Sequence, residues 1–273
     1  MYKFFFKEIM LISVIITVRN EERNLPNLLD SLVAQEQPIE IIIVDSASED
    51  RTVEIARSYA KRFDYIKIFE YGGTRGESRN FGARMANGDA LAFIDGDCIA
   101  HHLWIKEFRK SLENGDIIAG KTINIGTKSF EDLDRVELYY KGFDLTYPSC
   151  NLIYKQKVFE NINGFDPWFR TAEDIDLNYR AVDKGAKIIY NQNAVVYHRT
   201  RSNLLGFFKQ AFWNGFGRKQ LTLKHGRLWK NYRPVEMIKA NITFWYLARL
   251  GIALLGYFTC KFLRRRDYKP KPT

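Results

Sequence analysis

The stretch "LISVIITVRNEERNLPNLLDSLVAQEQPIEIIIVDSASED", residues 11–50, decides the fold class. It contains two largely apolar, β-branched runs, 11–18 and 39–44, and between them a segment whose leucines recur at helical spacing. Apolar runs of this kind are typical of strands that are buried on both faces in a parallel sheet. The stretch therefore predicts a strand–helix–strand unit with polar side chains directly after each strand.

The same alternation continues through the next fifty residues. "YIKIFEYGG" (65–73) predicts a strand, "GESRNFGARMANG" (76–88) a helix, and "DALAFIDGDC" (89–98) another strand. Strands that alternate with helices, without hairpin signals, indicate an α/β fold: a doubly wound, mainly parallel sheet with helices on both faces. Such sheets bind ligands at the carboxyl ends of their strands.

The charge of the chain is unevenly distributed. Residues 1–198 contain 25 Lys and Arg against 30 Asp and Glu, a net charge of −5, whereas residues 199–273 contain 17 against two, a net charge of +15. A basic tail is compatible with a nucleic-acid partner or with an anionic membrane surface. We predict an α/β domain over residues 1–200 and a basic, apolar helical region over residues 201–273.

The cysteines are few and widely separated. Cys98, Cys150 and Cys260 are odd in number and form no CxxC pair. This pattern argues against a disulfide framework and against a structural zinc site, and it fits a reducing cytoplasm. The apolar run at the start of the sequence is too short for a membrane span and continues straight into the first predicted strand. Met10 could be the true start of the domain, with residues 1–9 a short aromatic, basic extension.

The segment "FIDGDC", residues 93–98, places two carboxylates directly after a buried strand. Asp95 and Asp97 suit a hard divalent cation that also binds diphosphate oxygens. An Asp-Gly pair is equally typical of a plain turn around Gly96. The segment alone leaves both interpretations open.

Three further polar positions each have two interpretations. Asp45 ends the second strand and could bind a nucleoside or cap the next helix. Asp174 could act as a general base or form a capping box with Thr171, in which case Asp176 and Asp183 would be solvated helix charges. His198 follows an apolar strand and could be structural or belong to a site.

One phosphate-loop match is excluded by its context. "GDIIAGKT", residues 115–122, fits GxxxxGK[ST], but the mechanism requires a strand before the loop and a helix after it. Here a predicted helix precedes the match, and its central residues predict a strand. The dinucleotide fingerprint GxGxxG does not occur.

Five segments together resemble one enzyme family. They are "SVIITVRNEERNL" (13–25), "IIIVDSASEDRTVEIA" (41–56), "GESRNFGARMANGDALAFIDGDC" (76–98), "INGFDPWFRTAEDIDLNYRAVDKGAKI" (162–188) and "VVYH" (195–198). In this order and spacing they resemble the inverting family 2 glycosyltransferases, which have the GT-A fold. The resemblance covers residues 11–201.

The resemblance implies a metal-dependent hexosyltransferase that uses a UDP- or GDP-sugar in the synthesis of a cell-envelope glycan. The residues implied to bind the donor are Thr17, Arg19, Glu21, Asp45, Arg79 and Asp95. The residues implied to hold Mn²⁺ or Mg²⁺ are Asp95, Asp97 and His198. Asp174 matches the catalytic base, with Glu173 beside it; the base takes a proton from the acceptor hydroxyl as the anomeric carbon inverts.

The sequence departs from the family at two places. Cys98 stands where the family often carries a further acidic residue, and "TVRN" (17–20) replaces the commoner "PTYN". Both departures leave the donor preference open. The alternatives are a nucleotidyltransferase, although the acidic "TVRNEERN" (17–24) lacks its glycine- and lysine-rich loop, and a non-catalytic membrane-bound scaffold of the same fold.

The tail is expected to bind a membrane surface. Leu205, Phe208, Phe212 and Phe216 fall near one helical face, and residues 242–260 are apolar except for Arg249. A charge in the middle makes a simple span doubtful, while the basic run 261–273 would attract anionic lipid. We predict an interfacial helix on the cytoplasmic face of the cell membrane, near a glycan or lipid-linked acceptor, and no nucleic-acid partner. The alternative is a helix packed on the α/β domain.

Overall fold

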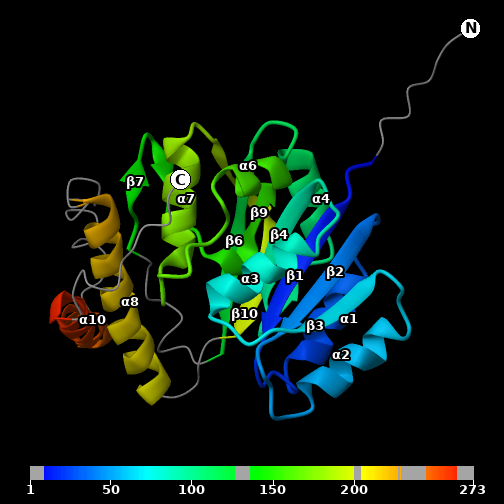
Figure 1. Ribbon diagram of the computed structural model, residues 1–273, viewed down its shortest axis with the longest axis horizontal. Coiled ribbons are helices and arrows are strands. Elements are labelled where there is room, and N and C mark those ends of the chain that lie inside the picture. The colour runs from blue at the N-terminus through cyan, green and yellow to red at the C-terminus, as the bar shows by residue number, and fades with distance from the viewer. Residues whose placement is uncertain (1–8, 127–135, 200–203, 227, 229–243, 263–273) are drawn as a thin grey trace, which may run out of the picture.

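The computed structural model describes residues 9–126, 136–199, 204–226, 228 and 244–262. It is built around one eight-stranded sheet with helices on both faces (Figure 1). The strand order is β3-β2-β1-β4-β9-β6-β10-β5. The predicted α/β class is confirmed. The N-terminal extension and the basic run at the C-terminus lie outside the described residues.

The first half of the sheet is parallel and follows the sequence prediction closely. β1 (Ile12–Val18) pairs with β2 (Ile39–Asp45) and with β4 (Ala90–Asp95), and β3 (Ile66–Glu70) continues the sheet beyond β2. All seven residues of β2 are buried. The continuous apolar runs therefore form strands covered on both faces, as expected for a parallel sheet.

The second half of the sheet mixes directions. β9 (Leu152–Lys155) runs antiparallel to both β4 and β6 (Ile117–Ile125). β10 (Ile188–Arg199) runs parallel to β6. The short β5 (Cys98–Ala100) pairs antiparallel with β10 and forms one edge of the sheet. The phosphate-loop match lies largely within β6, so its exclusion is confirmed.

Two helical layers enclose the sheet. One face is covered by α1 (Leu25–Val33), α2 (Thr52–Ala60) and α4 (Trp104–Ser111). The other is covered by α3 (Arg75–Arg84), α6 (Gln156–Asn161) and α7 (Glu173–Asp183). A small hairpin of β7 (Tyr139–Tyr140) and β8 (Phe143–Asp144) and a 3-10 turn, η1 (Ser149–Asn151), complete this part.

The helix α8 (Leu204–His225) packs beside α7 (Figure 1). Its last turn reaches Asp176, which is fully buried in α7: Lys224 Nζ and His225 Nε2 each lie 2.7 Å from one carboxylate oxygen. Arg180 Nε donates to the other oxygen at 2.8 Å. Burial raises the pKa of Asp176, but these partners outweigh it and lower the pKa to about 2. The interpretation of Asp176 as a solvated charge is therefore wrong.

The helix α10 (Phe244–Phe262) crosses α8 at very close range. A Cβ built on Gly215 would lie 1.7 Å from the carbonyl oxygen of Ala253, and one built on Gly256 would lie 1.9 Å from that of Phe212. Only glycine allows the two backbones to approach so closely. The tail is thus a pair of packed helices, in which α8 contacts the sheet domain and α10 contacts α8.

Both helices of the tail expose apolar side chains. Those of α8 are Leu204, Leu205 and Leu223, and those of α10 are Leu247, Leu250, Leu254, Leu255 and Phe258. On α8 the expected single face is divided, because Leu205 is exposed whereas Phe216 is buried. None of the helices within the described ranges has the length and apolarity that crossing a membrane requires.

Candidate active site

The predicted donor-binding residues meet at the carboxyl ends of the parallel strands. Thr17 of β1 pairs in register with Asp95 of β4, and Val18 pairs with Asp45 of β2. Because these three strands run in the same direction, their last residues lie side by side at one edge of the sheet. Arg19, just beyond β1, is exposed at the same edge.

Arg79 links two of the predicted motifs. It is buried in α3, and its guanidinium donates to Asp95 Oδ1 at 2.7 Å and to Glu173 Oε1 at 2.9 Å. Burial raises the pKa of Asp95, but Arg79 outweighs this effect and lowers the pKa below its usual value. One buried cation therefore fixes the end of β4 against the start of α7.

A third carboxylate faces the Asp95–Asp97 turn. Glu21 packs against Gly96: a Cβ built there would lie 3.0 Å from Glu21 Cγ and 2.9 Å from a methyl group of Val18. Burial raises the pKa of Glu21, and the charges of Asp97 and Asp95 raise it further against a hydrogen bond from Asn24. Three carboxylates so close together favour the binding of a cation.

Asp97, on the far side of this turn, lies beside His198 of β10. His198 Nε2 lies 3.5 Å from Asp97 Oδ1, and His198 Nδ1 lies 3.4 Å from Asn124 Oδ1. Burial lowers the pKa of His198, but the hydrogen bond to Asp97 outweighs it, so the pKa rises to about 9. The imidazole is thus held firmly beside the carboxylate.

One group of potential metal ligands is found among the described residues. Single ligand atoms of Asp97, Cys98 and His198 lie within 4.8 Å of one another. Asp97 and His198 were predicted as ligands, whereas Asp95 pairs with Arg79 and lies outside this group. A carboxylate and an imidazole suit Mn²⁺ better than Mg²⁺, so the residues fit a divalent ion at this position.

Asp174 lies in the first turn of α7, at the same edge of the sheet. Its carboxylate accepts from the backbone N–H of Ile175 at 2.8 Å and from that of Ser149 at 3.3 Å. Burial, and then the neighbouring charge of Glu173, raise the pKa of Asp174 to about 6. A carboxylate with a pKa near neutral pH is suited to take up a proton.

The two capping interpretations are wrong. α7 begins at Glu173 with Ala172 as its N-cap residue, which has a φ of 61° and provides no side-chain bond, so Thr171 forms no capping box with Asp174. α2 begins at Thr52 after Arg51, so Asp45 does not cap it. Asp45 instead accepts from the backbone N–H of Ser48 at 2.9 Å and orders the loop after β2.

Sequence reasoning missed Arg75 and Asn124. Arg75 Nη1 lies 4.0 Å from Glu173 Oε1, and its side chain is 58% exposed at the start of α3. It precedes Arg79 by one helical turn, so the spacing of the two arginines could have indicated a shared face. Asn124 offered no comparable signal, because its contact with His198 depends on the pairing of β6 with β10.

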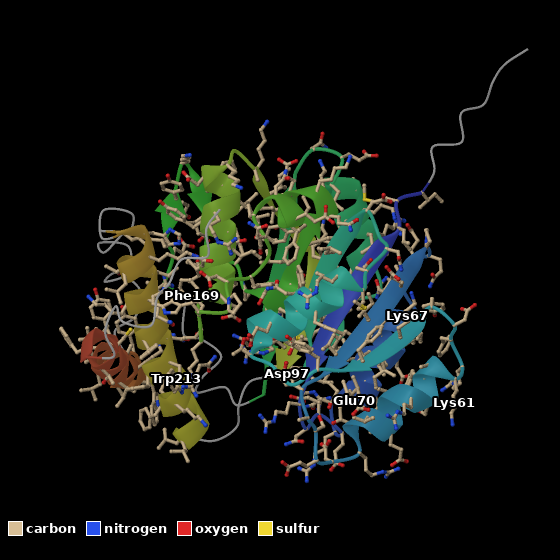
Figure 2. The ribbon with its side chains drawn as sticks, viewed as in Figure 1. Lys61, Lys67, Glu70, Asp97, Phe169 and Trp213 are labelled. Carbon is tan, nitrogen blue, oxygen red and sulfur yellow. The ribbon has the colours of Figure 1, made fainter. Side chains whose placement is uncertain are left out.

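Figure 2 shows Asp97 at the end of the sheet and Trp213 on the neighbouring α8. Arg170, just before α7, stacks over the Trp213 ring with its guanidinium carbon 4.3 Å from the centroid. Gln220 of α8 donates to the carbonyl oxygen of Trp168 at 2.8 Å. The loop that leads into Asp174 is therefore supported by α8.

The sequence and the fold define a sugar-transferring family. Residues 13–171 match the family described as Glycosyl transferase family 2. The chain is also 29% identical over 206 residues to "Glycosyltransferase AglE" of Haloferax volcanii, covering 70% of this chain and 67% of that protein. The chain belongs to glycosyltransferase family 2.

Solved structures show the same GT-A fold. "Mannosyltransferase PcManGT from Pyrobaculum calidifontis in complex with GDP-Man and Mn2+" has a TM-score of 0.64 at 15% identity, covering 93% of this chain and 75% of that one. S. aureus TarS 1-349 in complex with UDP-GlcNAc has a TM-score of 0.60 at 18% identity, covering 93% and 73%. The chain spans between 53% and 67% of the length of the first curated relatives it matches.

Proposed function

We propose that this chain transfers a sugar from a UDP- or GDP-sugar to a hydroxyl acceptor, with inversion at the anomeric carbon and with Asp174 as the general base. The observation that carries the proposal is the position and charge state of Asp174. Asp174 lies at the same edge of the sheet as the Arg79–Asp95 ion pair, and its pKa is raised to about 6. At neutral pH it is ionised and still basic enough to accept the proton of an attacking hydroxyl.

The other residues have supporting roles in this proposal. Glu173 acts through Arg79, which positions the start of α7 and therefore Asp174. Thr17, Arg19, Glu21 and Asp45 surround the nucleoside at the strand ends. Mn²⁺ or Mg²⁺ would be held at Asp97 and His198, where it would neutralise the charge of the leaving nucleoside diphosphate.

The acceptor in this proposal is a glycan or a lipid-linked hydroxyl at the cytoplasmic face of the membrane. The support comes from the tail, because α10 exposes leucines, Leu255 with 59% of its surface accessible, and because residues 199–273 carry a net charge of +15. Apolar side chains flanked by positive charge favour anionic lipid. A solvated basic groove, which a nucleic acid would require, is not what these apolar residues form.

The test is nucleoside diphosphate release from a panel of UDP- and GDP-sugars, with Mn²⁺ or Mg²⁺, by the full chain. We expect one donor class to be hydrolysed slowly and metal-dependently, and Asp174→Asn to abolish the activity. Asp183→Asn is the matched control, because Asp183 ends the same helix and is exposed. Release of sugar 1-phosphate, the leaving group of nucleotidyl transfer from a nucleotide sugar, would favour a nucleotidyltransferase, and no release of any product from any donor would favour the scaffold.

A further inference from the structure

A cysteine lies beside the two predicted metal ligands Asp97 and His198. Cys98 is the first residue of β5 and directly follows Asp97, and it pairs with His198 across the antiparallel β5–β10 ladder. Backbone pairing therefore brings a carboxylate, a thiol and an imidazole together. These three side chains are the group whose ligand atoms lie within 4.8 Å of one another.

The distances are close to those around a tetrahedral ion. Asp97 Oδ1 lies 3.5 Å from His198 Nε2 and 3.8 Å from Cys98 Sγ. Zinc bonds to oxygen, nitrogen and sulfur are about 2.0 to 2.3 Å long, so tetrahedral ligand atoms are about 3.3 to 3.7 Å apart. The separations between Asp97 and His198 and between Asp97 and Cys98 are thus close to those of a tetrahedral site. The third separation, between the thiol and the imidazole, is at most 4.8 Å and would have to shorten when an ion binds.

The surroundings also orient the ligands. His198 presents Nε2 to Asp97 while its Nδ1 faces Asn124 Oδ1, which is the second-shell contact that fixes a metal-bound imidazole. The backbone N–H of Arg199 donates to the carbonyl oxygen of Asp97 at 3.2 Å and ties β10 to the turn. The Cys150 thiol lies within hydrogen-bonding reach of Cys98.

We propose that Asp97, Cys98 and His198 bind Zn²⁺ or a similar thiophilic divalent ion without any nucleotide present, and prefer it to Mg²⁺. Thiolate and imidazole are favoured ligands of zinc and poor ligands of magnesium. Binding releases to solvent the proton of the Cys98 thiol and, where His198 is charged, the proton of the imidazolium. Three protein ligands leave a fourth position open for water or a diphosphate oxygen.

The experiment uses Co²⁺ as a spectroscopic substitute for zinc in the full-length, chelator-treated protein. We expect about one Co²⁺ per chain, with a thiolate-to-cobalt absorption band in the near ultraviolet that stoichiometric Zn²⁺ removes and a large excess of Mg²⁺ does not. A wild-type protein that shows no such band would overturn the proposal. The readout needs no donor sugar, so it succeeds or fails independently of sugar transfer.

Variants identify which side chains bind the ion. Cys98→Ser should lose the band, whereas Cys260→Ser, at a buried thiol in α10, should keep it. His198→Gln should weaken Co²⁺ binding at least about tenfold, and Asn124→Ala by about 10- to 100-fold, the usual cost of losing a second-shell partner. His198 is partly exposed, so this variant decides the question even if Cys98→Ser does not fold. A band that survives in Cys98→Ser but disappears in Cys150→Ser would overturn the assignment to Cys98.

Discussion

Two carboxylates in α7, Asp174 and Asp176, lie two residues apart in opposite electrostatic surroundings. Asp176 is fully buried among Arg180, Lys224 and His225, and its pKa is lowered to about 2. Asp174 accepts two backbone hydrogen bonds beside another carboxylate, and its pKa is raised to about 6. The first charge stabilises the fold, whereas the second is kept at a cost in stability and is free to react.

The largest expected effect is on catalysis through Asp174. Asp174→Asn keeps the shape of the side chain but cannot accept a proton, so we expect sugar transfer to fall by about 10²- to 10⁴-fold. Donor binding should change little. The same variant should raise the melting temperature at pH 8, because it removes an ionised carboxylate that burial and Glu173 disfavour.

Asp183→Asn, at the exposed end of the same helix, should leave both quantities nearly unchanged. The measurements are turnover with a saturating donor and thermal unfolding at pH 8. Wild-type turnover in Asp174→Asn would show that this carboxylate is not the base.

The second expected effect is on stability through Asp176. Asp176→Asn leaves Lys224 and Arg180 without their shared anion, and breaking a buried ion pair typically costs about 3 to 5 kcal/mol. We expect the free energy of unfolding, measured in urea at pH 7, to fall by this amount. The control is again Asp183→Asn, whose exposed pair with Lys141 should cost no more than about 1 kcal/mol.

A loss below about 1 kcal/mol in Asp176→Asn would mean that α8 is held mainly by its other contacts, among them the Lys224–Asp166 pair and the hydrogen bond from Gln220 to the carbonyl oxygen of Trp168. Lys224→Met provides a second test from the other side, because it removes one cation and keeps most of the buried chain. It should destabilise the protein less than Asp176→Asn, since Arg180 still pairs with the carboxylate and His225 still forms a hydrogen bond with it.

The sequence could indicate the carboxylate that we propose as the base, but not the structural one. Asp174 follows a recognisable motif, and the strands that position the other site residues have continuous apolar runs. The partners of Asp176 lie up to 49 residues further along the chain, in a helix whose own pattern predicts only an amphipathic segment. Local periodicity describes neighbours along the chain and gives no information about which distant helix supplies a counterion.

The same limit applies to Arg79 and to the cysteines. Arg79 was predicted near the donor from the resemblance, but its bridge between Asp95 and Glu173 depends on how α3 packs over the sheet. Cys98 and Cys150 are separated by more than fifty residues, yet the antiparallel pairing of β9 with β4 places η1, which carries Cys150, beside the end of β4, which Cys98 closely follows. Long-range packing decides both contacts.

The pH dependence should separate the two carboxylates by the direction of their effects. Asp176 has a folded-state pKa of about 2, below its unfolded value of 3.8, so its stabilisation is complete above pH 4 and is lost as the pH falls toward 2. Asp174 has a folded-state pKa of about 6, above 3.8, so its protonation adds stability as the pH falls from 6 to 4.

Of these two carboxylates, only Asp174 should affect activity. Below pH 6 the base becomes protonated, so kcat/KM should fall by about tenfold for each pH unit. The checks are a pH profile of kcat/KM between pH 5 and 8 and urea unfolding across pH 2 to 7. A profile that stays flat down to pH 5 would contradict the raised pKa of Asp174.

The smallest expected effect concerns the tail. Whereas α8 contacts the sheet domain through Asp176, α10 exposes an apolar surface. Leu255 is 59% exposed, and full burial of a leucine is worth about 1.5 to 3 kcal/mol. Leu255→Ser should therefore weaken binding to anionic vesicles by about 1 kcal/mol, or about fivefold. Leu103→Ser is the matched control, because Leu103 is an exposed leucine that caps α4 on the opposite face of the sheet.

The measurement is co-sedimentation of the full chain with anionic and with neutral vesicles. Weaker sedimentation of Leu255→Ser than of Leu103→Ser, with anionic vesicles preferred, would show that α10 enters the interface and that its charge contributes. Equal sedimentation of the two variants would exclude α10 as the docking element. No sedimentation of the wild type would favour a soluble acceptor, and the ion cluster at Asp176 would then serve only to fasten a helix pair to the sheet domain.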